Sequence, residues 1–250
     1  MSIRLAQFLS VAIPMVLTAA TALGESPGDA ESTTKDRVIA IDVLLQPDAN
    51  MVAKAEAANA RLRENYPRGY TLGKEQVAHI TLVHAYVREK DLPVIEEQIS
   101  KLAKAAQPEK WELTANAYTS AIWSGLAITT IGVEHTRALD AFQEDVERVV
   151  AHYTAREGTA GAFSTTRELP KIEHEIVDYV QNFSAKSSGK NYKPHVTIGV
   201  AHEDFVDKLK TQPFEKFTFK PAGVAIYQLG NFGTAQKKLW EWPAAQKHSP

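Results

Sequence analysis

Two short apolar stretches of this chain share one pattern: Val77-Ala78-His79-Ile80-Thr81-Leu82-Val83 and Pro194-His195-Val196-Thr197-Ile198-Gly199-Val200. Each is rich in β-branched residues around a His-x-Thr triplet, which predicts a β-strand. Because successive side chains of a strand point to opposite faces, the His and Thr of each triplet share a face. Their apolar neighbours fall on the other face and are expected to pack beneath helices.

The surroundings of the triplets sharpen this prediction. A third triplet, His152-Tyr153-Thr154, ends a segment whose apolar residues have helical spacing, so its His and Thr should not share a face and we treat it as a coincidence. Gly199 and Ala201 continue the period of Thr197, and such small residues would leave room for a ligand. Strict alternation places His84, five residues after His79, on the opposite face, toward the core or a helix.

These residues resemble a known family, the two-histidine (2H) phosphoesterase superfamily, which includes the LigT-like 2′-5′ RNA ligases and cyclic nucleotide phosphodiesterases. Tyr192-Lys193-Pro194-His195-Val196-Thr197-Ile198 is similar to its second motif, and Ala78-His79-Ile80-Thr81-Leu82 to its first. The resemblance covers residues 37–243. It implies an α+β fold of two pseudo-symmetric lobes, each a small, mostly antiparallel sheet backed by helices, around a central concave cleft with one His-x-Thr strand per lobe.

The residue types fit phosphodiester chemistry. Hydrolysis needs one proton removed from water and one delivered to the leaving oxygen, and His is the side chain that serves near neutrality as both base and acid. We therefore assign His79 and His195 as catalytic residues. Thr81 and Thr197 are assigned to bind the non-bridging phosphate oxygens. This scheme demands no metal or other cofactor, and we expect none.

Further candidates are less specific. Tyr192 and Lys193 precede the second motif and are assigned to substrate binding, although a structural role in entering the strand explains them as well. The polar stretch 184–191 is predicted to be a flexible loop. Its residues Lys186 and Lys190 can either close over a phosphate or simply be solvated. Asp42 is the one charge in the strand predicted over 38–45; an edge position or a substrate-facing position would explain it, and we favour a structural role.

The ends of the chain predict its compartment. Arg4 and the apolar run 5–23 precede a polar segment, which is typical of a cleavable secretory signal peptide over 1–24. Residues 25–36 read as a linker and 244–250 as a disordered tail, which leaves one domain over 37–243. We therefore expect a secreted or periplasmic protein with no stable membrane span after signal cleavage.

Composition limits the partners. Lys and Arg number 28 against 30 Asp and Glu, a net charge of −2, which argues against tight binding to long nucleic acid. The absence of cysteine excludes disulfides, thiolate nucleophiles and Cys-ligated zinc. We expect a monomeric, exported phosphodiesterase acting on a 2′,3′-cyclic phosphate or on a 2′-5′-linked nucleotide or short oligonucleotide; the resemblance supplies this substrate class. Alternatives are 2′-5′ RNA ligation by the same histidines, or a non-catalytic nucleotide- or protein-binding module.

The remaining elements follow from periodicity. Besides the motif strands, the first over 77–87, the sequence predicts further strands and helices. The strands are 38–45, 111–119, 126–133, 215–220 and 223–229, and the helices are 50–64, 91–105, 135–153, 202–211 and one that opens at the capping-box pattern Thr165-Thr166-Arg167-Glu168 with Pro170 in its first turn.

Overall fold

The computed structural model contains both helices and strands and describes residues 36–123, 125–167 and 169–243. The predicted signal peptide, nearly all of the predicted linker and the predicted tail lie outside these residues. The elements are β1 (Val38–Pro47), α2 (Ala49–Asn65), β2 (Ile80–Arg88), α3 (Leu92–Ala106), β3 (Leu113–Trp123), β4 (Leu126–Val133), α4 (Arg137–Ala151), α5 (His174–Gln181), α6 (Phe183–Ser187), β5 (His195–Ala201), α7 (Glu203–Lys210), β6 (Phe217–Phe219), β7 (Pro221–Leu229) and β8 (Ala235–Trp242).

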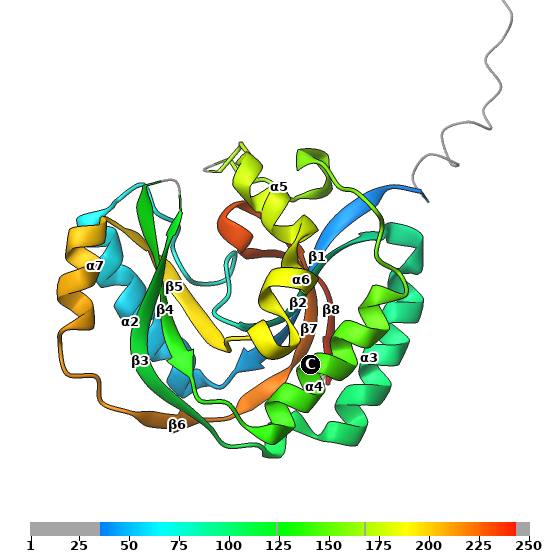
Figure 1. Ribbon diagram of the computed structural model, residues 1–250, viewed down its shortest axis with the longest axis horizontal. Helices are drawn as coiled ribbons and strands as arrows, with labels where there is room; N and C mark the ends of the chain where they lie inside the picture. Colours follow the sequence, from blue (N-terminus) through cyan, green and yellow to red (C-terminus); the bar gives the residue numbers. More distant parts are fainter. Residues whose placement is uncertain (1–35, 124, 168, 244–250) are drawn as a thin grey trace, which may run out of the picture.

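The strands form one curled sheet of eight strands in the order β6-β3-β4-β5-β2-β1-β7-β8, and every neighbouring pair is antiparallel (Figure 1). The predicted α+β class is confirmed. The two motif strands, β2 and β5, are neighbours at the centre of this sheet. Among the described residues a single pair, Ile80 with Val196, joins them in register, whereas the other strands pair over three residues or more. The expected two small sheets are therefore present as one continuous sheet with a narrow join.

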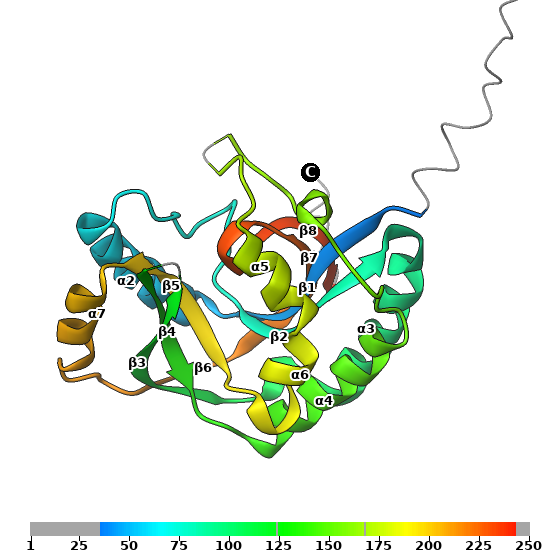
Figure 2. The ribbon, with the colours of Figure 1, turned by 45° about the horizontal axis from the view of Figure 1, so that its top comes forward.

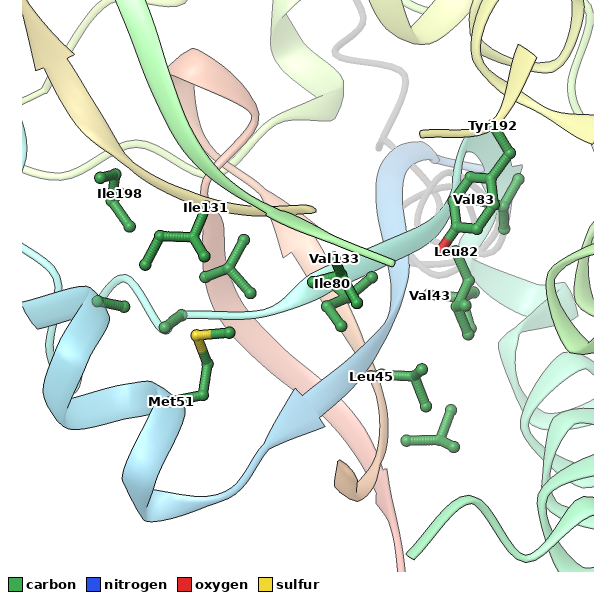
Figure 3. Packing of buried hydrophobic residues seen from close by; sticks show 14 of the residues in the cluster. Val43, Leu45, Met51, Ile80, Leu82, Val83, Ile131, Val133, Tyr192 and Ile198 are labelled. Atoms are coloured by element: carbon green, nitrogen blue, oxygen red, sulfur yellow. The ribbon is translucent and has the colours of Figure 1, made fainter. Parts of the chain in front are cut away.

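Helices cover the outer face of both halves of this sheet. In Figure 1, α2 and α7 lie outside β3, β4 and β5, while α3 and α4 lie outside the half that contains β1, β2, β7 and β8. The core forms where these helices meet the sheet: Met51 of α2 belongs to the same buried cluster as Ile131, Val133 and Ile198 (Figure 3). Burying side chains of this size stabilises the fold by about 1.5–3 kcal/mol each.

The inner face carries shorter helices. Figure 2 shows α5 and α6 over the middle of the sheet, where both contact β2. Helix α5 covers a second buried cluster that includes Ala40 of β1, Tyr86 of β2 and its own Ile176. Strand β1 thus has two buried faces, and its alternate residue Asp42 points to the inner one with no exposed surface.

Each motif strand has a β-bulge directly after its His-x-Thr triplet. In the pairing of β2 with β1, Thr81 lies opposite Leu44 and Val83 opposite Val43, so Leu82 is the extra residue. In the pairing of β5 with β4, Thr197 and Gly199 lie opposite consecutive residues, so Ile198 is the extra residue. A bulge shifts the alternation of the residues that follow it by one.

A buried amide side chain from an outer helix caps each bulge. Asn59 of α2 donates from Nδ2 to the Ile198 carbonyl at 2.9 Å, and Gln143 of α4 donates from Nε2 to the Leu82 carbonyl at 3.1 Å. The same amides bind the segments that lead into the motifs. Asn59 binds the backbone of Tyr70 and Leu72, before the first motif, and Gln143 binds Ser188 and Gly189, before the second. Each amide therefore ties the bulge of one motif to the approach of the other.

The bulges overturn two predictions. His84 was expected on the face opposite the motif, yet with Leu82 as an extra residue it shares the inner face with Thr81, and His84 Nε2 lies 3.3 Å from Thr81 Oγ1. Gly199 and Ala201 were expected to leave space for a ligand, but Ala201 is fully buried in the core cluster. Gly199 faces α2 at φ +134°, and a Cβ there would lie 2.8 Å from Asn59 Nδ2. The missing side chain makes room for the Asn59 amide.

Three boundaries also differ from the prediction. Strand β2 begins at Ile80, so His79 lies just before it. The helix expected from the capping-box pattern begins only at His174, because a turn in which Leu169 N–H donates to Thr166 Oγ1 replaces its start. The stretch 184–191, predicted to be a flexible loop, contains most of α6 and a 3₁₀ turn over Gly189–Asn191. Strand β8 was not predicted.

Candidate active site

The four motif side chains line one cleft on the inner face of the sheet. This cleft has a volume of about 610 Å³, and His79, Thr81, His195 and Thr197 all contribute to its surface. Because β2 and β5 run antiparallel through the Ile80–Val196 pair, His79 lies beside Thr197 and Thr81 beside His195. The two histidines are then diagonal neighbours, whose Cα atoms in antiparallel strands are about 7–8 Å apart. Both rings line the cleft, which is large enough to hold a phosphate.

The same backbone contact orients both imidazoles. His79 Nδ1 lies 2.7 Å from the carbonyl oxygen of Val77, and His195 Nδ1 lies 2.6 Å from that of Lys193. A carbonyl oxygen only accepts, so Nδ1 carries the proton in each ring. In both motifs the contact reaches back two residues, and it leaves Nε2 as the ring nitrogen that is directed away from the backbone.

The surroundings of the two Nε2 atoms differ. His79 Nε2 lies 3.1 Å from Oδ2 of Asp42, and the ring is only 8% exposed. His84 Nε2 approaches the same oxygen at 3.2 Å. His195 is partly exposed, and no described protein atom is a hydrogen-bond partner of its Nε2. The cleft is therefore asymmetric: one imidazole faces a buried carboxylate and the other faces open space.

The electrostatics follow this asymmetry. Burial alone would lower the pKa of His79, but the charge and hydrogen bond of Asp42 outweigh it and raise that pKa above its usual value. Burial likewise acts to raise the pKa of Asp42, but His84 and His79 hold it well below its usual range. The pKa of His195 is lowered, by loss of hydration in the cleft and by the charges of His79 and His84.

The other predicted residues occupy distinct places. Thr81 and Thr197 are both partly exposed on the cleft floor, and Thr81 donates from Oγ1 to Asp42 Oδ2 at 3.2 Å. Lys193 is exposed at the edge of the cleft. Tyr192 is buried in the core cluster that includes Leu82 and Val83, and its hydroxyl donates to the Thr81 carbonyl at 3.2 Å (Figure 3). Its contacts support the first motif strand.

The walls of the cleft combine aromatic and polar surfaces. One wall consists of Tyr179 of α5, Phe183 of α6 and Phe232, which follows β7 and has a left-handed φ of +58°. The other wall, from β3 and β4, carries Thr119 and Thr130, whose hydroxyls lie 2.6 Å apart, and Asn116. Lys186 of α6 adds a positive charge at the edge. Such walls suit a ligand with an apolar ring, hydroxyl groups and a negative charge.

Metal-ligating clusters and membrane-spanning helices were both sought in the described chain. Within residues 36–123, 125–167 and 169–243, no group of three or more His, Cys, Asp or Glu side chains is placed to hold a metal ion. Over the same residues, no helix is both long enough and apolar enough to span a membrane.

The family to which this chain belongs follows from its match to a known family model. A family model described as the 2′-5′ RNA ligase superfamily matches residues 51–230. The chain belongs to the 2′-5′ RNA ligase superfamily. The match to this LigT-like, 2H phosphoesterase group confirms the resemblance seen in the two motifs, and it spans the cleft-lining residues from His79 to Thr197.

Several solved structures are similar to this superfamily member. TT0787 of Thermus thermophilus is 14% identical, with 81% of this chain and 96% of that chain covered and a TM-score of 0.47. E. coli LigT complexed with 3′-AMP is 10% identical, with 82% and 98% covered and a TM-score of 0.41. Kluyveromyces marxianus Usb1 with uridine monophosphate is 11% identical, with 83% and 100% covered and a TM-score of 0.38. Among curated proteins, no significant match was found.

Sequence reasoning missed three residues of the site and underrated a fourth. Asn59 and Gln143 are polar residues within the buried stripes of α2 and α4, a signal that was available because polar side chains are rarely fully buried without a purpose. His84 was placed on the wrong face, and Asp42 was noticed without its partners. β1 is a central strand, which excludes the edge position considered for Asp42.

Proposed function

We propose that this protein is a metal-independent phosphodiesterase that hydrolyses 2′,3′-cyclic phosphates or 2′-5′-linked nucleotides and short oligonucleotides by two-histidine acid–base catalysis. One observation carries the proposal: both triplets meet at the Ile80–Val196 pair, and their His and Thr side chains line the same cleft. Two imidazoles in that arrangement serve both proton transfers of a phosphodiester hydrolysis.

The Thr residues complete the chemistry. Thr81 and Thr197 lie beside the opposite histidine, so each hydroxyl is next to a phosphate held between the rings; Thr197 can donate to it directly, and Thr81 can donate once its proton turns from Asp42 to the phosphate. Lys193 and Lys186 add positive charge at the edge of the cleft, where it attracts an anionic ligand. Tyr192, by contrast, is assigned to holding the Thr81 backbone rather than to stacking on the substrate.

The substrate class rests on the family and on the walls of the cleft. The related structures of LigT and Usb1 are described with 3′-AMP and uridine monophosphate, respectively. A nucleotide has the three features that the walls can contact: a ring for Phe183 and Phe232, hydroxyls for Asn116 and Thr130, and a phosphate for the motifs.

We also infer that the protein has two lobes and that it is exported. The two capped bulges, each following a His-x-Thr triplet, support two pseudo-equivalent lobes that meet between β2 and β5. Export rests on the sequence of residues 1–24 alone. Detection of the mature protein, shortened by that segment, in the secreted or periplasmic fraction of the host tests it; the full-length chain in the cytoplasm would refute it.

The test of function is a product assay on nucleoside 2′,3′-cyclic phosphates and 2′-5′-linked dinucleotides in the presence of EDTA. We expect turnover in EDTA, and a loss of kcat of about 10²–10⁴ in His79→Ala and in His195→Ala. His152→Ala is the matched control, since it alters the His of the third triplet, which is exposed at the end of α4. Full activity in either motif variant would refute the proposal. Nucleotide binding without turnover across the panel would favour a binding module.

A further inference from the structure

Asp42 is a buried carboxylate at the base of the cleft. It lies on the central strand β1, paired in register with His84 of β2, and it has no exposed surface. Three side-chain atoms contact one of its oxygens, Oδ2: His79 Nε2 at 3.1 Å, His84 Nε2 at 3.2 Å and Thr81 Oγ1 at 3.2 Å. The other oxygen, Oδ1, has no hydrogen-bond partner among the described residues. A buried polar atom without a partner destabilises a fold by about 1–3 kcal/mol, so packing alone does not account for this residue.

Hydrogen-bond geometry fixes the proton count on His79. The Val77 carbonyl can only accept, so His79 Nδ1 donates to it. An ionised carboxylate also only accepts, so His79 Nε2 donates to Asp42. With both nitrogens donating, His79 is an imidazolium. His195 shares the first contact, through the Lys193 carbonyl, but not the second, so its Nε2 keeps a lone pair toward the cleft.

We propose that Asp42 is a positioning residue that keeps His79 protonated and reserves it as the general acid, which leaves His195 as the general base, and that His84 holds Asp42 in place. The inference rests on the proposed function. His195 Nε2 takes a proton from water while the water oxygen bonds to phosphorus. The bond from phosphorus to the ester oxygen breaks, and the Nε2 proton of His79 passes to that oxygen. Exchange of one proton with solvent at each ring restores the starting state.

The Nε2 proton of His79 is bound to Asp42 but remains available for transfer to a substrate. Charge-assisted N–H···O bonds are usually about 2.7–2.9 Å long. The His79–Asp42 contact is longer, at 3.1 Å, because three donors share one oxygen. A phosphate oxygen that enters beside Thr81 can therefore compete with Asp42 for this proton. His84 holds Asp42 in place from the other side, and its ring packs against Phe183 with a centroid distance of 4.9 Å.

The titratable and charged groups around the cleft support this assignment. Besides His79 itself, they are Asp42 of β1, His84 of β2, His135 after β4, Tyr179 of α5, Lys186 of α6, Tyr192 and Lys193 before β5, and His195 of β5. Asp42 is the only carboxylate among these described groups, and it contacts only one of the two motif rings. The raised pKa of His79 and the lowered pKa of His195 agree with an acid and a base, respectively.

The experiment measures the pKa of each histidine by NMR in the wild-type protein, Asp42→Asn and His84→Phe, together with the pH profile of kcat/KM. We expect the pKa of His79 to exceed that of His195 in the wild type. Asp42→Asn should lower the pKa of His79 by about 1–3 units and move the alkaline limb of the profile to lower pH by the same amount. His84→Phe keeps a ring beside Phe183 but removes a competing donor and a positive charge from Asp42 Oδ2, so the pKa of His79 should not fall in this variant as it does in Asp42→Asn.

The control is Gln228→Leu, which removes another buried polar side chain of the inner face. Gln228 donates to the Ala162 carbonyl and contacts neither motif histidine, so its loss should lower stability without moving the limb. An alkaline limb that stays in place in Asp42→Asn, or a higher pKa for His195 than for His79, would overturn the inference. The NMR comparison needs no substrate. A protein that turns over no phosphodiester would therefore refute the proposed function while the order of the two pKa values was still measured.

Discussion

Ile80 and Val196, the middle residues of the two His-x-Thr triplets, pair with each other across β2 and β5. They are the one register pair that joins these strands in the part of the chain that the structure describes, so the two halves of the sheet meet at the motifs themselves. An antiparallel pair has local twofold symmetry, which brings each His beside the Thr of the other triplet. The site and the join between the halves are therefore the same feature.

The buried amides of Asn59 and Gln143, on the outer helices, also connect the two motifs to each other. Asn59 and Gln143 each hold the bulge of one motif and the approach segment of the other. A movement of either helix is thus transmitted to both triplets. Positions held in this way are the kind on which acid–base catalysis depends, because a misplacement of about 1 Å can reduce the rate about 100-fold.

The two Thr hydroxyls are predicted to differ in their effect on stability. Thr197→Val and Thr81→Val should each lower kcat/KM by about 10- to 100-fold, the value of a hydrogen bond to a charged oxygen. Thr81→Val should also lower the free energy of unfolding by about 1 kcal/mol or more, because its hydroxyl donates to the buried Asp42. Steady-state kinetics and urea unfolding measure both effects. Thr154→Val, in the third triplet, is the control, and equal kinetics in all three variants would contradict the prediction.

The amide caps are predicted to affect both stability and rate. Asn59→Leu and Gln143→Leu each leave a buried carbonyl without a donor, so each should lower the free energy of unfolding by about 2–3 kcal/mol. Because the caps also position the motifs, kcat should fall more than KM rises. Gln98→Leu is the control, since its amide binds the Tyr153 hydroxyl and no bulge. Variants that are destabilised but keep wild-type kcat would show that the caps do not position the histidines.

Gly199 is predicted to be intolerant of a side chain. At φ +134°, an alanine there is strained, and its Cβ would lie 2.8 Å from Asn59 Nδ2. Gly199→Ala should therefore lower the free energy of unfolding by about 1–3 kcal/mol. Gly161→Ala should change it by less than about 0.5 kcal/mol, since its Cβ would make an ordinary 3.5 Å contact with Thr159. Equal stabilities of the two variants, measured by urea unfolding, would disprove this account.

Local patterns predicted much of the fold. Periodicity and composition within one segment predicted the strand over 38–45 and the helices over 50–64 and 91–105, and the structure has these elements within about two residues. The two motifs were identified by their resemblance to those of a known family. The bulges escaped prediction because one extra residue in a strand leaves the apolar pattern of that strand intact while changing which residues share a face. His84 and Gly199 both lie after a bulge, and both were misplaced for this reason.

The rest required contacts between distant segments. The register of β1 against β2, which the sequence does not display, brings Asp42 opposite His84 and hence to His79. The helix expected from the Thr165-Thr166-Arg167-Glu168 pattern begins at His174 because tertiary contacts compete with the local signal: Glu173 N–H donates to Asn231 Oδ1, from a turn after β7. Local propensity is a weak guide where such contacts form.

The Asp42–His79 pair gives the stability of the protein a defined pH dependence. The pKa of Asp42 is lowered on folding, so its contribution is present above its unfolded pKa of about 3.9 and is lost as the pH falls below that value. The pKa of His79 is raised on folding, so its contribution is complete below about pH 6.5 and is lost as the pH rises through the folded pKa. The difference in unfolding free energy between the wild type and Asp42→Asn should thus be largest between about pH 4 and 6.5.

Urea unfolding of both proteins from pH 3 to pH 9 measures this difference. Asp140→Asn is the matched control, because Asp140 also pairs with a histidine, His135, at 2.8 Å, but both side chains are exposed. Exposed pairs contribute little, so its difference should stay below about 1 kcal/mol at every pH. A difference for Asp42→Asn that is equally flat would mean that His79 carries no additional proton in the folded protein, and His79 would then be no better suited than His195 to act as the acid.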